Sequence, residues 1–374
     1  MDIFDFITNR AKNTELIMSE TESHSVVFES DFFKSVESSQ SQGIGLRTIQ
    51  NDKIGFSFSN DFNDQEIVDR ALESAQFGEK ACFSFAGDKK VPDLPLYHRE
   101  VMDTSIESMI GFGERAIEAI KDYNPEIKVD VGIEKETYQI TLKTSNGFDH
   151  SYRKSFYSVG VNGLLAKNDQ LLSISKGKTR YHPFDDIDSL TEPIIEQFKL
   201  STRSANIKTG NYKILFTPRA FRSLLSILLP SLSGKAVQKG ISPLDHRLGE
   251  LIVSKSFTLT DSGTLKDGIA SAPFDGEGTL SRENHLFTDG VLKTFIYDLQ
   301  TGGLMKEKST GSGSRGYSSL PSPSFRNLRV EPGNESYESL LSRTLIIRTA
   351  LSSTVVAHNQ ELKFHKKLVK IFWN

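Results

Sequence analysis

The chain has 374 residues, of which 37% are hydrophobic and 25% are charged, a balance typical of a folded globular protein. Its formal net charge is -3, so it lacks the overall positive field that would attract a nucleic-acid backbone. The single cysteine, Cys82, excludes an internal disulfide and a cysteine-rich zinc cluster. We expect Cys82 to pack as a small apolar residue.

The N-terminus carries Asp2 and Asp5 where a secretory signal would carry lysines. The longest aliphatic stretch lies within Leu224–Leu229, far short of the roughly 20 residues that a membrane-spanning helix needs. We therefore predict a cytoplasmic protein with no membrane segment and no nucleic-acid partner.

The first half of the chain alternates between helical and strand patterns. Apolar residues that recur every three or four positions indicate helices, and apolar residues at every second position indicate strands. Thr104 and Glu107 have the spacing of a capping box, which predicts the start of the third helix. We expect helices over residues 2–12, 65–80, 104–120 and 189–199, and strands within 24–58 and 127–180.

The second half begins with a predicted strand over 212–216, followed by a helix that Thr217 and Pro218 would start as N-cap and first turn. Pro230 should kink or end this helix. Short strands and turns follow, so this half is predicted to be β-rich. Because helices and strands come in blocks, we predict an α+β fold with an N-terminal domain over 1–205 and a truncated β-rich C-terminal domain over 206–341.

No motif for nucleophilic or zinc-dependent hydrolysis is present. The chain has no G-x-S-x-G elbow and no H-E-x-x-H pair, and its eight histidines are scattered. The acids Asp261, Asp267, Asp275 and Glu277 could form an oxygen-ligand cation site or a substrate-amine site, or they could simply make turns. Turns are the favoured interpretation, because the spacing does not match an EF-hand.

The glycine-rich stretch over 309–316 could hold a phosphate on its backbone N–H groups. It lacks the Gly-Lys-Ser/Thr ending of a P-loop, and no helix pattern follows it. We favour a loop that docks through its backbone.

Several segments together resemble the TldD/PmbA family, whose members were once described as modulators of DNA gyrase. They include the motifs Gly43-Ile-Gly-Leu-Arg47, Pro273-Phe-Asp-Gly-Glu-Gly278 and Ser309-Thr-Gly311. Their order and spacing carry the resemblance from about residue 40 to 341. The further segments are 55–61, 212–218, 232–242, 248–250, 289–298, 321–323, 327–328 and 331–333.

The resemblance implies that this chain lacks the family's zinc site. TldD-like members carry H-E-x-x-x-H on the helix after the strand near residue 216, and the corresponding positions here are Leu225, Ser226 and Pro230. None of these side chains can hold zinc. The chain is thus identified with the TldE/PmbA branch, which implies no cofactor in this chain and zinc only in a TldD-like partner.

The resemblance also implies a role in degrading or trimming small unfolded peptides. We expect four residues to line the substrate cavity: Asp275, Glu277, Gly311 and Arg315. Two alternatives stay open at this stage: a stand-alone hydrolase that uses the acids between Asp261 and Glu277, and a binding or scaffold protein without enzymatic activity. A homodimer could compete with the heterodimer.

Residues 342–374 do not fit the family pattern. They contain no glycine, and Glu361 is the single acid among many basic residues. A frameshifted ending is the favoured interpretation, with a basic partner-binding tail or a divergent functional ending as alternatives. We expect this tail to be disordered or loosely helical, and its removal to change stability by no more than about 1 kcal/mol.

Overall fold

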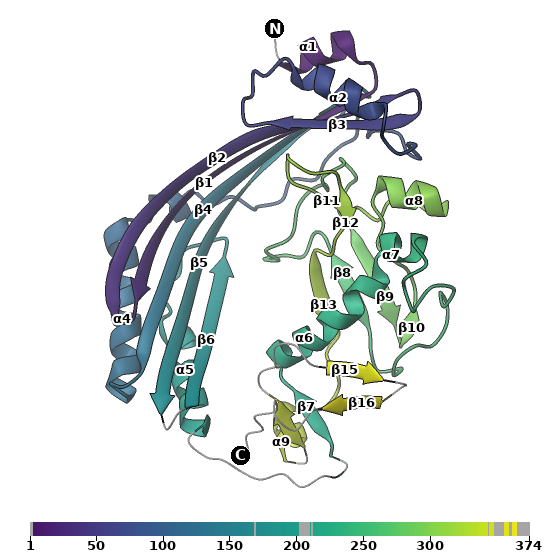
Figure 1. Ribbon diagram of the computed structural model, residues 1–374. Coiled ribbons are helices and arrows are strands. Elements are labelled where there is room, and N and C mark those ends of the chain that lie inside the picture. Colours follow the sequence, from purple (N-terminus) through teal and green to yellow (C-terminus); the bar gives the residue numbers. More distant parts are fainter. Residues whose placement is uncertain are drawn as a thin grey trace.

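The computed structural model describes residues 3–167, 170–201, 210, 212–342, 344–347, 355–358 and 361–364. A large curved sheet forms its N-terminal half, and a compact β-rich part sits against the concave side of that sheet (Figure 1).

The large sheet has six strands, all antiparallel, in the order β3-β2-β1-β4-β5-β6. Asn51 and Asp52 adopt positive φ in the tight turn between β2 and β3. The strands are β1 (Thr14–Glu29), β2 (Phe32–Gln50), β3 (Lys53–Ser59), β4 (Lys128–Thr144), β5 (Asp149–Lys167) and β6 (Gln170–Arg180).

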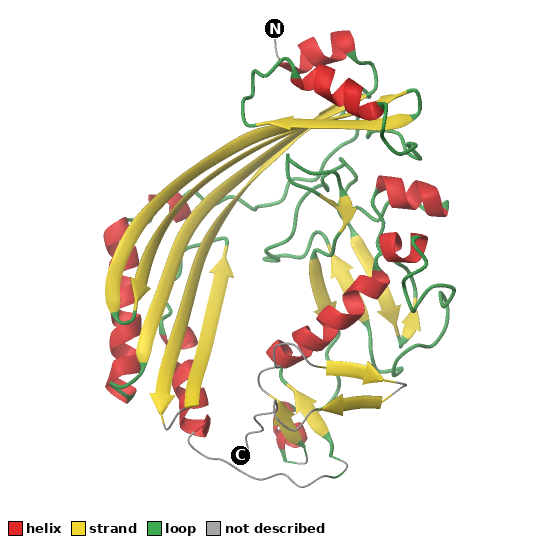
Figure 2. Cartoon of the chain, in the orientation of Figure 1, coloured by secondary structure: helices red, strands yellow, loops and turns green. Residues whose placement is uncertain are grey.

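Helices cover the outer, convex face of this sheet (Figure 2). They are α1 (Ile3–Arg10), α2 (Ile67–Ala75), α3 (Glu100–Asp103), α4 (Ile106–Tyr123) and α5 (Asp188–Ser201). Period-two alternation places Val129, Val131 and Ile133 of β4 on this face, where they form one core with α4 and α5. A second core lies under α1 and α2, around Leu16 and Leu46.

The inner, concave face is apolar only where the C-terminal part docks. Ile140 and Leu142 of β4 pack there with Phe148 and with Phe274 from the C-terminal part. Farther along the strands the inner face is lined by hydroxyl side chains that stay at least partly accessible. They include Thr21, Ser23 and Ser25 on β1, and Ser39 and Ser41 on β2.

The C-terminal part is built from short elements around a third core that contains Leu259, Phe287 and Ile296. A four-stranded sheet in the order β10-β9-β8-β13 forms its centre. The strands are β7 (Ile214–Phe216), β8 (Leu259–Ser262), β9 (Glu283–Thr288), β10 (Val291–Leu292), β11 (Gly313–Ser314), β12 (Ser322–Pro323) and β13 (Asn327–Val330). The helices are α6 (Pro218–Leu228), the 3-10 helix η1 (Leu229–Leu232), α7 (Gly234–Gln238), α8 (Leu299–Met305) and α9 (Tyr337–Leu341).

The α+β fold is as predicted, with helices and antiparallel sheets in separate blocks. One local prediction is wrong: Ser105, not Thr104, caps α4, because its side chain accepts the hydrogen bond from the Ser108 N–H. The predicted boundary at residue 205 falls outside the described residues, and the division into two domains stays a prediction. None of the described helices is long and apolar enough to cross a membrane.

The expectation of a disordered or loosely helical tail is wrong for the segments that the structure describes beyond residue 342. They form β14 (Leu345–Ile347), β15 (Val355–His358) and β16 (Glu361–Phe364). Strand β14 pairs in parallel with β7, and Ile346 is buried. This pairing places a β-prone segment of the tail on an open strand edge. The rest of the tail lies outside the described residues.

The docking of the C-terminal part requires glycine at Gly45. A Cβ at this position would lie 2.1 Å from the Tyr317 carbonyl oxygen, whereas a Cβ at Gly132, on the same face of the sheet, meets nothing within 4 Å. We predict that Gly45→Ala lowers the free energy of unfolding by about 1–3 kcal/mol, because backbone must move. Gly132→Ala should leave it unchanged or raise it by about 0.5–1 kcal/mol. Urea unfolding of both variants checks this, and equal effects would contradict the docking contact.

Candidate functional site

Helix α6 and the following η1 carry the three positions that the resemblance assigned to zinc ligands. Thr217 caps α6 through the Ala220 N–H, and Pro218 occupies its first turn, as predicted. At Pro230 the helix has tightened into η1. Leu225 packs against the third core, and the exposed Ser226 donates its hydroxyl to the Ser223 carbonyl oxygen at 2.7 Å.

The side chains at these positions do not fit a zinc ion. Leucine and proline have no donor atom, and zinc in proteins is held by imidazole, thiolate or carboxylate groups. Within the described parts of the chain, no group of three or more His, Cys, Asp or Glu side chains could hold a metal ion. No catalytic step through zinc can therefore be derived from the residues of α6.

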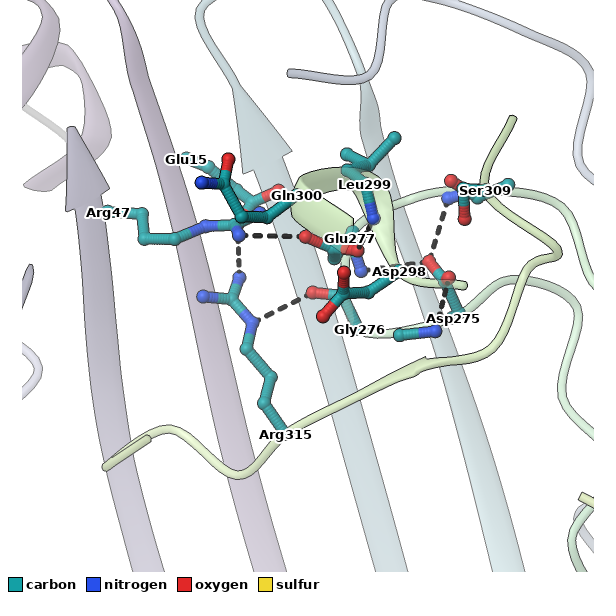
Figure 3. Close-up of polar contacts among 12 residues, drawn as sticks. Glu15, Arg47, Asp275, Gly276, Glu277, Asp298, Leu299, Gln300, Ser309 and Arg315 are labelled. Atoms are coloured by element: carbon teal, nitrogen blue, oxygen red, sulfur yellow. Dashed lines mark hydrogen bonds and ion pairs between the residues drawn. The ribbon is translucent and has the colours of Figure 1, made fainter. Parts of the chain in front are cut away.

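A second constellation joins the large sheet to the C-terminal part through buried charges (Figure 3). Arg47 of β2 donates from Nε to Glu15 of β1 at 2.9 Å, and from Nη1 to Glu277 at 2.7 Å. The side chains of all three residues are at most 2% exposed. The Arg47 guanidinium also lies over the rings of Phe83 and Phe85, at 4.8 and 5.3 Å from their centroids.

Arg315 closes the network from the other side. Its Nη2 lies 2.5 Å from the same Glu15 oxygen, and its Nε donates to the Gly276 carbonyl oxygen at 2.8 Å. The second oxygen of Glu277 accepts from the Leu299 N–H, at the start of α8, at 2.7 Å. Two carboxylates and two guanidinium groups are thus paired in the junction.

The pKa shifts in this network follow from burial and pairing. Burial opposes ionisation of Arg47, but Glu15 and Glu277 outweigh it and raise its pKa. Burial raises the pKa of Glu277 to about 7, although Arg47 opposes that shift. For Arg315, burial dominates and lowers the pKa.

Asp275 and Gly311 make close contacts with the backbone of the same region. Asp275 accepts from the N–H groups of Glu277 and Thr279, both at 2.9 Å, and from Gly313 at 2.8 Å. Gly311 has φ of +70°, and a Cβ there would lie 2.5 Å from the Leu280 carbonyl oxygen. These contacts support the backbone-docking interpretation of the glycine-rich stretch.

The predicted lining residues Asp275, Glu277 and Arg315 are therefore brought together, but in buried contacts between parts of this chain. Two polar cavities, of about 600 and 420 Å³, meet instead at Gln139 and Arg153 on the outer face of the sheet. None of the predicted residues lines either one. A direct contact of those residues with substrate stays a prediction.

The acids between Asp261 and Glu277 do not form one site. Asp275 makes the turn favoured by the sequence, and Asp267 adopts positive φ in an exposed turn. Asp261 is separately buried in β8; its Oδ1 accepts from the Arg326 N–H at 2.7 Å, and its Oδ2 has no hydrogen-bond partner in the described structure. Burial raises the pKa of Asp261 to about 6.

Sequence reasoning missed Glu15 and the role of Arg47. The available signal was a charged residue inside a strand that is otherwise apolar, such as Leu46-Arg47-Thr48. A charge at such a position must be paired if the strand is buried. The partners of Arg47 could not be identified, because Glu15 lies on another strand and Glu277 is 230 residues away in the sequence.

The curved sheet, the docked C-terminal part and α6 together match the domains of one class of metallopeptidases. Three family models match the chain: PmbA/TldA metallopeptidase domain 1 over residues 14–76, the central domain over 100–199 and the C-terminal domain over 209–369. The chain belongs to the TldD/PmbA family. The last match runs to residue 369, so the expectation that the resemblance ends at 341 is wrong.

Curated relatives agree with this family. An uncharacterised protein of Methanocaldococcus jannaschii is 31% identical over 82% of this chain and 72% of its own length. The metalloprotease TldD homologue of Buchnera aphidicola is 24% identical, covering 84% and 69%. The metalloprotease PmbA homologue of Haemophilus influenzae is 21% identical, covering 82% and 70%.

Solved structures share the fold. TldE from Thermococcus kodakarensis superimposes with a TM-score of 0.86 at 19% identity, over 94% of this chain and 82% of its own. A protein from Thermotoga maritima described as a modulator of DNA gyrase gives 0.84 at 22% identity, with the same coverage. The first two family models fall on strands of one continuous six-stranded sheet in this chain.

The buried network predicts a large effect of Arg47. Arg47→Met would leave Glu15 and Glu277 buried without their shared cation, so we expect the free energy of unfolding to fall by about 3–5 kcal/mol. Arg10→Met is the matched control, because its ion pair with Asp69 is about half exposed and should be worth less than about 1 kcal/mol. Denaturant unfolding measures both. Similar small losses would show that the junction does not depend on Arg47.

Asp261 predicts a pH dependence of stability. Its folded pKa, about 6, lies above the unfolded value of about 4, so its contribution to stability is present below pH 4 and is lost between pH 4 and 6. Asp261→Asn cannot ionise. We expect its stability relative to the parent chain to rise by about 2–3 kcal/mol between pH 4 and 7. Urea titrations at each pH test this against Asp267→Asn, the exposed control, which should show no trend.

Proposed function

We propose that this chain is a non-catalytic, TldE/PmbA-type subunit that acts beside a zinc-binding subunit of the same family. The observation that carries the proposal is the chemistry of α6, where Leu225, Ser226 and Pro230 stand at the positions of the family's H-E-x-x-x-H. Without a ligand set or an adjacent general base at these three positions, α6 and η1 offer no means to activate a water molecule on zinc. Zinc is expected only in the partner.

Two kinds of relatives support the pairing. The family contains members named TldD homologues and PmbA homologues, and the chain superimposes on a protein named TldE. A chain that keeps the family fold but lacks zinc ligands at the three motif positions would suit the role of a supporting subunit. A self-paired dimer of this chain would compete with that assembly.

The proposed assembly acts on small, unfolded peptides. In it, the partner supplies the hydrolytic chemistry, and this chain supplies walls that hold substrate and exclude folded proteins. The loop around Asp275 and Glu277 shapes that wall indirectly, because its ion pairs fix the C-terminal part against the sheet. Arg315 contributes to the same junction, and Gly311 packs against the Leu280 backbone within the C-terminal part.

The metal content of the purified chain is the first test. We expect the chain alone to contain no stoichiometric zinc and to cleave no peptide, because α6 offers no ligand set. Metal analysis by mass spectrometry and a peptidase assay measure the two properties. A 1:1 zinc content with activity in the isolated chain would overturn the proposal.

Co-expression with a family member that carries H-E-x-x-x-H is the complementary test. We expect the two chains to co-purify, with zinc and peptidase activity present only in the complex and lost when the partner's motif is altered. Complex formation without any effect on the partner's turnover would instead identify a scaffold. A partner that never associates with this chain would remove the main support for a subunit.

A further inference from the structure

Lys154 is a buried lysine on the inner face of the large sheet. It lies on β5, opposite Tyr138 of β4, and only 6% of the residue is exposed. Its Nζ is 5.6 Å from the centroid of the Tyr152 ring. Within the described structure, this amine makes no hydrogen bond and no ion pair.

The same sheet shows how a buried lysine is normally satisfied. Lys135 of β4 is 8% exposed on the outer face, and its Nζ donates to the carbonyl oxygens of Met102 and Thr104, both at 2.7 Å. A buried ammonium group without such partners costs several kcal/mol. Lys154 therefore stands out as a cation that has no partner among the residues that the structure describes.

Arg326 is a second cation near Lys154, contributed by the C-terminal part just before β13. Its positive charge lowers the pKa of Lys154, and it opposes the rise in the pKa of Tyr138 and Tyr152 that burial causes. Its Nε is buried and lacks a hydrogen-bond partner, and within the described residues the guanidinium makes no ion pair. The junction thus brings two unpaired cations together from two parts of the fold.

The surroundings set the charge of a ligand that would fit. Burial, and then the charge of Arg326, lower the pKa of Lys154 to about 7. Nearby acids limit how much negative charge can enter. The charge of Arg326 opposes the rise in the pKa of Asp261 and of Asp275, and the charge of Glu136 acts on Tyr138. A group with one negative charge would pair with Lys154 and Arg326, whereas a dianion would be repelled by the acids.

We propose that Lys154 and Arg326 form a binding site for a single carboxylate group at the meeting point of the sheet and the C-terminal part. The planar guanidinium matches the geometry of a carboxylate, and the ammonium adds a second charge-assisted hydrogen bond. The bound group would complete the hydrogen bonding that the chain leaves open.

The site is continuous with the uncovered part of the inner face. In the next row of the sheet, Ser23, Glu136 and Phe156 share that face and are each half-buried. Beyond them lie the hydroxyl groups of Ser25 and Ser158. A carboxylate at Lys154 could therefore belong to a longer molecule, either as the C-terminus of a peptide or as an acidic side chain. This assignment does not depend on a zinc-binding partner.

Titrations of the whole chain by nuclear magnetic resonance test the site. The probes are trialanine, trialanine amide, a capped Ala-Asp-Ala peptide, acetate and inorganic phosphate, added to protein carrying ¹³C-labelled lysine. We expect trialanine to bind and its amide not to bind. The Lys154 Cε signal should titrate near pH 7 in the free protein and at higher pH with the carboxylate bound.

Lys154→Met and Arg326→Met should each weaken carboxylate binding by at least about tenfold. Arg153→Met is the matched control, because Arg153 is the adjacent residue of β5, lies on the outer face and stacks on Tyr97. It should bind like the parent chain. Lys154→Met removes an unpaired buried charge and is expected to fold at least as stably as the parent chain.

The probes also separate the two sources of the carboxylate. Preference for trialanine identifies a peptide C-terminus, and preference for the capped Ala-Asp-Ala peptide identifies an acidic side chain; either supports the site. Equal binding of trialanine and its amide would overturn the proposal, as would unchanged binding in Lys154→Met. Tighter binding of phosphate than of any carboxylate would overturn the assignment to a single charge.

Discussion

The guanidinium of Arg47 sits between Glu15 of the sheet and Glu277 of the C-terminal part, and the relative position of these two parts depends on that contact. Each charge is buried, so each would carry a large desolvation cost if the two parts docked in any other register. The pairing is complete only when Arg315 also reaches Glu15. Buried charge therefore makes the docking specific, while the apolar contacts around Phe274 supply most of its stabilisation.

This fixed docking divides the inner face of the sheet into two regions. Near the junction the face is covered by the C-terminal part, which buries both apolar side chains and the charges around Arg47. Farther along β1 and β2 the face carries hydroxyl groups and is partly accessible. Hydroxyl groups can donate or accept hydrogen bonds without charge, so such a surface suits an extended backbone of variable sequence. Lys154 lies at the border of the two regions, where a ligand chain would reach the closed end.

Elements with a strong, one-sided apolar period were predictable, and those without it were not. The helices α4 and α5 each bury one stripe, and their positions agree with the expected ranges. The beginning of β1 was missed, because its middle is polar on both faces: Glu20 and Glu22 border an outer cavity, and Thr21 and Ser23 face the open inner side. The ion-pair network could not be predicted, since its members come from opposite ends of the chain and carry no local pattern.

Helix α6 is positioned by its N-terminal cap and by apolar packing. Its start depends on Thr217 and Pro218, and its position depends on apolar contacts such as those of Leu225 and Leu228 with the third core. None of these contacts needs a metal ion. Leu225 adds apolar contacts to the third core, whereas an imidazole there would need an oriented partner for its second nitrogen. The C-terminal part is thus held by its core and by the buried ion pairs.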